Sequence, residues 1–138
     1  MKEDEEMDQS EKRLFLIKRL LKEQPRYSNI QIPIDTHEQK SMLRSLMNIR
    51  MPVTMDDEFL SVQDEYLLQV NAEKGVVALS DMEEIQPDLY IWKGDITRLK
   101  VGAIVNAANS GMTGCYQPCH NCIDNCIHTY AGIQLRFT

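Results

Sequence analysis

Apolar residues recur at helical spacing over three stretches of the first half of the chain. The apolar stripes, with charged residues between them, predict amphipathic helices over residues 14–24, 36–50 and 56–74. The first helix is expected to end before Pro25, since proline cannot continue it. Asp35 or Thr36 is expected to cap the second helix.

The pattern changes from Asp88 onward, where strand-forming residues replace the helical stripes. Leu89–Trp92 and Val101–Val105 predict two strands, the second of them buried, because short apolar runs rich in β-branched and aromatic residues favour sheets. A turn is expected at Gly94–Thr97, between them. Cys122–Tyr130 then predicts a helix that stops at Gly132.

This change divides the chain into two predicted parts. Residues 1–87 form a helical N-terminal extension, and residues 88–138 begin an α/β unit. About fifty residues are too few to close a sheet between two layers of helices, so the sheet is expected to be incomplete.

Charge and length exclude several classes of protein. A net charge of −6 and a pI near 5.0 argue against a basic surface for nucleic acid, although backbone N–H groups can still hold a small phosphate-bearing ligand. No apolar run approaches the roughly 20 residues of a membrane span. The acidic N-terminus lacks the apolar core of a secretion signal, so a cytoplasmic location is expected by default.

All four cysteines fall between Cys115 and Cys126. A secreted disulfide scaffold would spread its cysteines along the chain, so this clustering indicates a metal site or a reactive thiol. With His120 and His128, six candidate ligands lie within fourteen residues. Thiolates and imidazoles are the ligands that zinc prefers. Buried free cysteines with two incidental histidines are the structural alternative.

The spacing alone leaves the metal open. Cys115, Cys119 and Cys122 form C-x3-C-x2-C, which radical SAM enzymes use for an iron–sulfur cluster. Those enzymes need a large barrel after the motif, whereas sixteen residues follow Cys122 here. His120 inside the motif favours a mixed zinc site. A closed site of the four cysteines is a third possibility.

Four polar residues near the cysteines have both a functional and a structural interpretation. Asp124 shares a helix face with His128 and either orients a ribose hydroxyl or water, or forms a surface ion pair or a helix cap. Asn106 and Asn109 follow the apolar run and suit ribose hydroxyls, or are ordinary turn residues. Asp95 either accepts hydrogen bonds from a nucleobase amine or caps a short helix starting at Ile96.

Together, G-D-I-T from Gly94, A-I-V-N-A-A-N-S from Ala103 and G-C…H-x-C-I-D-N-C-I-H-x-x-A-G from Gly114 resemble a macrodomain. Cys115, His120 and Cys122 stand where ordinary macrodomains have a glycine-rich loop. That departure is similar to the zinc-dependent branch, whose members remove ADP-ribose from proteins. S-L-M-N-I-R and E-F-L-S-V-Q-D-E-Y-L in the N-terminal part also resemble that branch.

The resemblance implies a three-layer α/β/α fold and a set of roles. It implies Zn²⁺ ligands at Cys115, His120 and Cys122. ADP-ribose would contact the chain at Asp95, Ile96, Asn106 and Asn109. Asn109 and Asp124 would be the catalytic residues and would orient the distal ribose. Cys119 lies at a variable position. Cys126 is expected to lie in the following helix and to pack in the interior of the protein.

The implied activity is hydrolysis of the glycosyl bond at C1″ of ADP-ribose on a mono-ADP-ribosylated protein. Zinc would polarise an oxygen or activate a water through an open fourth position. The second glycine-rich loop, which wraps the phosphates in macrodomains, has no counterpart among the six glycines, so the chain resembles a truncated macrodomain. The alternative is a non-enzymatic remnant that acts at most as a zinc-binding or interaction module.

Overall fold

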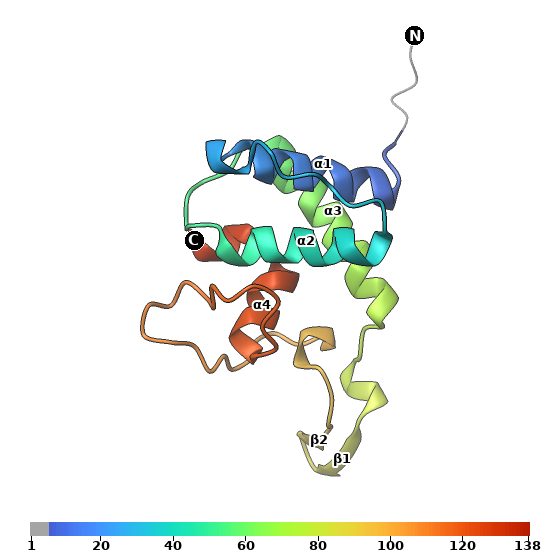
Figure 1. The fold of residues 1–138 in the computed structure, drawn as a ribbon. Coiled ribbons are helices and arrows are strands. Elements are labelled where there is room, and N and C mark those ends of the chain that lie inside the picture. Colours follow the sequence, from blue (N-terminus) through green and yellow to red (C-terminus); the bar gives the residue numbers. More distant parts are fainter. Residues whose placement is uncertain (1–5) are drawn as a thin grey trace.

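Three amphipathic helices make up the first half of the computed structural model, which describes residues 6–138 (Figure 1). They are α1 (Gln9–Lys22), α2 (Thr36–Ile49) and α3 (Asp57–Lys74). Each follows an aspartate whose side chain accepts a hydrogen bond from a backbone N–H of the first turn, and Asp35 is the residue that caps α2. The predicted helices are confirmed, since helical spacing and caps are local properties of the sequence.

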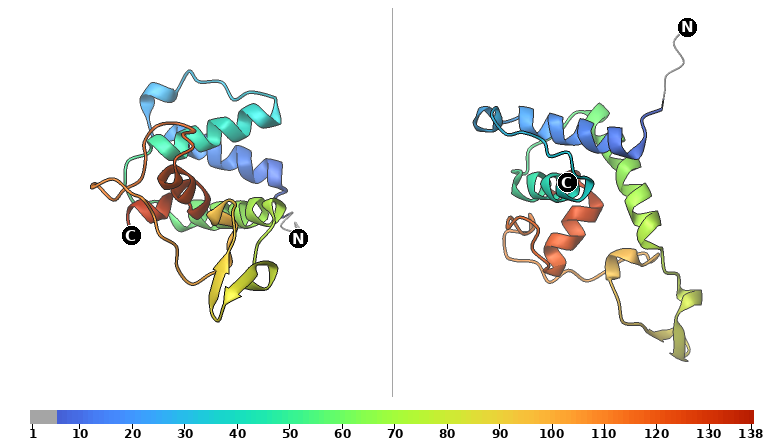
Figure 2. Two further views of the ribbon diagram at one scale, coloured as in Figure 1. Left: turned by 90° about the horizontal axis from the view of Figure 1, so that it is seen from below. Right: turned by 45° about the vertical axis from the view of Figure 1, so that its right-hand side comes forward.

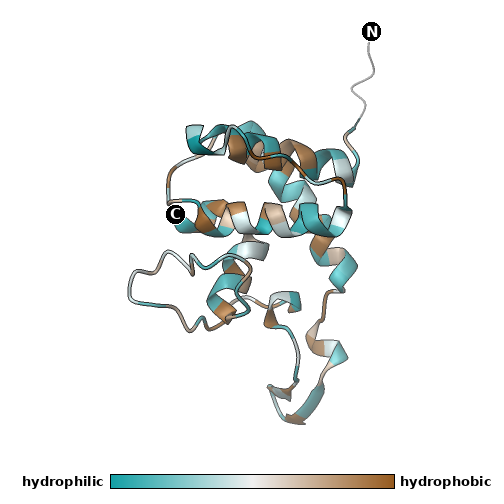
Figure 3. Ribbon diagram, viewed as in Figure 1, coloured by the Kyte–Doolittle hydropathy of each residue, from teal (hydrophilic) through white to brown (hydrophobic). Residues whose placement is uncertain are grey.

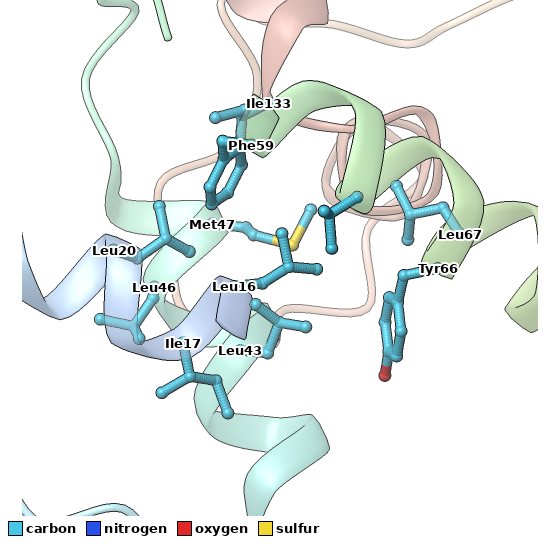
Figure 4. Close-up of a cluster of buried hydrophobic side chains, with 11 residues drawn as sticks. Leu16, Ile17, Leu20, Leu43, Leu46, Met47, Phe59, Tyr66, Leu67 and Ile133 are labelled. Carbon is cyan, nitrogen blue, oxygen red and sulfur yellow. The ribbon is translucent and has the colours of Figure 1, made fainter. Parts of the chain in front are cut away.

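The hydrophobic core lies where α1, α2 and α3 face one another. Polar and apolar residues alternate along each helix in Figure 3, which is the pattern that buries one face of a helix. Leu16, Ile17 and Phe59 are at most 1% exposed. Ile133, from the C-terminal end of the chain, lies beside Phe59 in the same core (Figure 4). The core therefore holds the last residues of the chain against the first three helices.

A small hairpin stands apart from the helices (Figure 2). β1 (Glu83–Gln86) pairs antiparallel with β2 (Leu89–Ile91). The strand predicted over Leu89–Trp92 is thereby confirmed as β2. Asp88, with φ of 61°, makes the turn. The hairpin spans both sides of the expected boundary after residue 87.

The buried strand predicted over Val101–Val105 is not formed. The segment is irregular and exposed, with Val105 88% accessible. Strands bury their backbone groups by pairing with neighbours, and among residues 6–138 β1 and β2 pair only with each other. The described chain is accordingly mostly helical with one two-stranded sheet, and the expected α/β/α layering is not seen in it.

The fourth helix, α4 (Ile123–Ala131), lies under α2 and also contacts α3 (Figure 2). It ends at Gly132, as predicted, where φ is 97° and a Cβ would lie 2.5 Å from the Gln63 amide. The short 3-10 turn η3 (Ile96–Arg98) precedes α4 in the chain, and a second one, η4 (Ile133–Arg136), follows it. None of the helices described over residues 6–138 is long and apolar enough to span a membrane.

Candidate metal centre

The loop ahead of α4 brings two thiols and one imidazole together. The ligand atoms of Cys115, His120 and Cys122 all lie within 4.8 Å of one another, and Cys115 Sγ is 3.7 Å from His120 Nδ1. Two ligands bound tetrahedrally at zinc–sulfur and zinc–nitrogen bond lengths are roughly 3.5–3.8 Å apart. The three donors therefore fit one small thiophilic cation after only slight contraction of the cluster.

Cys122 is fixed by the start of α4. It is the N-cap residue, and its sulfur accepts a hydrogen bond from Asn125 N–H at 3.4 Å. Burial raises the pKa of the Cys122 thiol, the neighbouring Cys115 and Asp124 raise it further, and the Asn125 N–H opposes them. A bound cation would favour the thiolate, which is the form that ligates metals.

The other two cysteines lie outside this cluster. Cys119 Sγ is 3.3 Å from Ser45 Oγ and 3.6 Å from the Ser41 carbonyl, both on α2. Cys126 lies on α4, with its sulfur 3.8 Å from the Arg44 guanidinium. Neither the C-x3-C-x2-C set nor the four-cysteine set is gathered, so the geometry favours the mixed thiol–imidazole set.

Asp124 and His128 form a buried pair beside the loop, with 4% and 7% of their surfaces exposed. His128 Nε2 lies 3.6 Å from Asp124 Oδ1, and Asn106 Nδ2 donates to the same oxygen at 2.8 Å. Burial lowers the pKa of His128. The Asp124 carboxylate opposes this shift, and the positive charge of Arg136 adds to it. The pair is thus not the surface ion pair considered from the sequence, and Asn106 is more than a turn residue.

Asn109 and Asp95 make local contacts in the structure. Asn109 Oδ1 accepts from Gly111 N–H at 2.9 Å, and its amide donates to the Gly114 carbonyl at 3.1 Å. Asp95 caps η3 by accepting from Thr97 and lies 3.2 Å from Lys74 Nζ. Burial raises the pKa of Asp95, but the hydrogen bonds from Thr97 and Lys74 outweigh it and lower the pKa overall.

The residues implied for ADP-ribose are therefore only partly brought together. Asn106 hydrogen-bonds Asp124, whereas Asp95 caps η3, which begins at Ile96 and packs against α4. A cavity of about 500 Å³ lies between α2, α3 and α4, and none of these residues lines it. The metal donors are assembled in the described chain, and a complete ADP-ribose pocket is not.

Three side chains from outside residues 115–122, which we call the metal loop, form hydrogen bonds with its backbone, and the sequence patterns did not predict them. They come from α2 and η4: Arg44, Asn48 and Arg136. One signal was present in the sequence, since Asn48 is a polar residue between Met47 and Ile49 in S-L-M-N-I-R. The contacts themselves join residues more than seventy positions apart for α2, which no local pattern reveals.

Comparison with known proteins gives two informative relatives. The chain is 58% identical over 134 residues to a protein-ADP-ribose hydrolase of Treponema medium, an alignment that covers 94% of this chain and 51% of that protein. It is 42% identical over 123 residues to a protein-ADP-ribose hydrolase of Staphylococcus aureus (strain MRSA252), covering 88% of this chain and 46% of that protein. No model of a known protein family matches the chain.

The matches extend over nearly the whole chain, so they include the helical part as well as the cysteine loop. The chain spans about half the length of these relatives. The resemblance found in the motifs is confirmed, and the chain is a homologue of the protein-ADP-ribose hydrolases.

Proposed function

We propose that this chain is the metal-binding part of a zinc-dependent hydrolase that removes ADP-ribose from mono-ADP-ribosylated proteins. The observation that carries the proposal is the cluster of Cys115, His120 and Cys122 in a homologue of protein-ADP-ribose hydrolases. Three protein ligands leave one position of a tetrahedral site open, which is typical of catalytic rather than structural zinc.

The donor set supports zinc over iron–sulfur. Iron–sulfur clusters are held mainly by thiolates, whereas here an imidazole stands beside two thiols and Cys119 lies against α2. When bound, zinc supplies Lewis-acid polarisation of oxygen in or near the reacting sugar.

The reaction breaks the bond between C1″ of the distal ribose and the protein side chain. Water supplies the hydroxyl that C1″ gains and the proton that the leaving side chain takes. Asn109 and Asp124 orient the ribose for this exchange. Asn106 holds the Asp124 carboxylate through its 2.8 Å hydrogen bond, which suits a residue that must present one oxygen in a fixed direction.

The nucleotide end of the ligand is assigned to η3. Asp95 accepts hydrogen bonds from the adenine amine, and Ile96 packs beside the ring. Asp95 is ionised at neutral pH, since burial raises its pKa but the hydrogen bonds from Thr97 and Lys74 lower it below the ordinary value overall. An ionised carboxylate is a strong acceptor for an amine N–H.

The proposal is tested by metal analysis of the purified chain together with release of ADP-ribose from a mono-ADP-ribosylated protein. Cys122→Ala should lose both bound zinc and hydrolysis. Cys126→Ala is the matched control, because it removes a cysteine of the same region that lies outside the cluster. Full hydrolysis by Cys122→Ala without bound metal would overturn the proposal, and iron with sulfide would revive the iron–sulfur interpretation.

A second function is favoured by the local contacts of the ligand-binding residues. Asp95 and Asn109 satisfy their side chains within the chain, and neither of them lines the cavity between α2, α3 and α4. This arrangement fits a zinc-binding module without turnover. Stoichiometric zinc with no release of ADP-ribose would favour the module over the hydrolase.

A further inference from the structure

The metal loop does not fix its own shape. Residues 115–122 include no helix or strand, and the backbone hydrogen bond within them runs from His120 N–H to the Gln117 carbonyl at 3.2 Å. Cys122 is held by its place at the start of α4. Cys115 and His120 have no such support from secondary structure, so their positions depend on contacts from outside the loop.

Helix α2 supplies contacts at the His120 end. The Arg44 guanidinium donates to the His120 carbonyl at 2.9 Å and to Asn125 Oδ1 at 3.0 Å. One turn further along, Asn48 Oδ1 accepts from Cys119 N–H at 3.0 Å, while its amide donates to Thr129 Oγ1 at 3.0 Å. Asn48 is 1% exposed, so its contacts are formed without competition from water.

Arg136 supplies the contact at the Cys115 end. Its guanidinium donates to the Cys115 carbonyl at 3.1 Å and to the carbonyls of Met47 and Arg50, which lie at the end of α2, at 3.1 and 2.6 Å. It also lies 4.1 Å from the centre of the Tyr116 ring. Arg136 is 7% exposed and thus joins the loop to α2 inside the molecule.

We propose that Arg44, Asn48 and Arg136 are positioning residues, which place Cys115 and His120 within reach of the metal that Cys122 also binds. The inference rests on the metal site of the proposed function. Its basis is that the three ligands are positioned in two different ways. Cys122 is fixed by its place at the start of α4. The Arg44 guanidinium donates to the His120 carbonyl, and the Arg136 guanidinium donates to the Cys115 carbonyl. Outer contacts of this kind orient ligands and tune metal affinity.

The experiment titrates the metal-free full chain with Co²⁺ and follows the thiolate-to-cobalt absorption, with a competing chelator to measure affinity. Arg44→Met and Arg136→Met keep an apolar stem and remove the donors at the His120 and Cys115 ends. Asn48→Leu replaces the acceptor by an apolar group of similar size. Each variant should bind Co²⁺ ~10- to 100-fold more weakly, with an altered absorption band. Arg44→Lys keeps a charged donor and should recover part of the affinity.

Ile17→Val is the control for loss of stability. Ile17 is fully buried in the core on α1, a helix that supplies none of the proposed positioning residues. The Ile17→Val variant should lower the melting temperature of the metal-free chain while leaving Co²⁺ affinity and absorption unchanged. If Ile17→Val weakens Co²⁺ binding as much as Arg44→Met does, the effect is general destabilisation and the inference fails.

Failure of the positioning roles and failure of the proposed metal site give different results. Wild-type affinity and absorption in Arg44→Met, Asn48→Leu and Arg136→Met would overturn the positioning roles and leave the metal site standing. Absence of Co²⁺ binding in the wild-type chain would overturn the metal site of the proposed function, and the positioning roles with it. Arg44 is only half-buried, so its two variants keep the test decisive if Asn48→Leu does not fold.

Discussion

Gly114 brings the metal loop against α4 at a distance that only glycine allows. Its φ is 94°, and a Cβ added there would lie 2.8 Å from the His128 ring. Gly114→Ala should therefore strain the backbone and push the loop away from α4, at a cost of about 1–3 kcal/mol in stability. Urea unfolding measures the loss, and unchanged stability would mean that the loop does not approach His128 as described.

His128 should make the stability of the metal-free chain depend on pH. Its pKa in the folded chain is lowered from the ordinary value of 6.5, chiefly by burial. Between the lowered pKa of the folded chain and the ordinary value of 6.5, the unfolded chain binds more protons than the folded chain. The free energy of unfolding therefore rises with pH through this range and falls as the pH drops below about 6.5. Unfolding free energies measured across the window in the presence of a chelator test this expectation.

His128→Gln should flatten that dependence, since glutamine does not titrate. His37→Gln is the control, because His37 is exposed on α2. The same slope in His128→Gln and in the wild-type chain would show that another group causes it.

At the residue scale, the sequence was most informative where the chemistry is local. Cys115, His120 and Cys122 lie within eight positions of one another, so their residue types and spacing predict a shared site, and the structure gathers them. The burial of Asp124 could not be predicted, because its carboxylate is bonded by Asn106, a residue eighteen positions earlier in the chain. A carboxylate in the first turn of a helix is most often exposed.

At the scale of elements, too, local features could be predicted from the sequence and contacts between distant segments could not. α2 and α3 were predictable because their apolar stripes lie within each helix and their capping aspartates come directly before it. Val101–Val105 has the composition of a buried strand, yet a strand depends on partner strands that are often distant in the sequence. The described residues supply no such neighbour, and the run stays exposed.

Ile133 tests whether the C-terminal elements and the first three helices unfold together. Its side chain is 3% exposed and packs in the core of α1, α2 and α3. Ile133→Ala should cost about 2–5 kcal/mol, the usual range for removing most of a buried aliphatic side chain. Hydrogen exchange should show the loss of protection in α1 and α3 as well as in α4.

Leu135→Ala is the control from the same turn, because Leu135 is 39% exposed. It should change stability by less than about 0.5 kcal/mol. Loss of protection confined to α4 in Ile133→Ala would instead support separate folding of residues 1–87 and 88–138.

At the scale of the molecule, α2, α4 and η4 converge on the metal loop, and α4 also packs against the other two elements. Arg44 and Asn48 reach it from α2, Cys122 begins α4, and Arg136 reaches it from η4. The unfolded chain has none of these contacts, so it should hold the three donors far less closely than the folded chain does. Metal binding is then expected to act on the stability of the whole chain rather than on the loop alone.

Zinc should therefore raise the unfolding free energy of the chain, and chelation should remove the gain. At free zinc 100 times the dissociation constant, the gain is about 2.7 kcal/mol if the unfolded chain does not bind. Thermal melts with zinc and with excess chelator measure it, and Cys122→Ala should melt identically in both. Equal melting of the wild-type chain in the two conditions, with Co²⁺ binding retained, would mean that the unfolded chain binds as tightly. In that case the fold would contribute nothing to the site, and the contacts from α2 and η4 would have no effect on the metal.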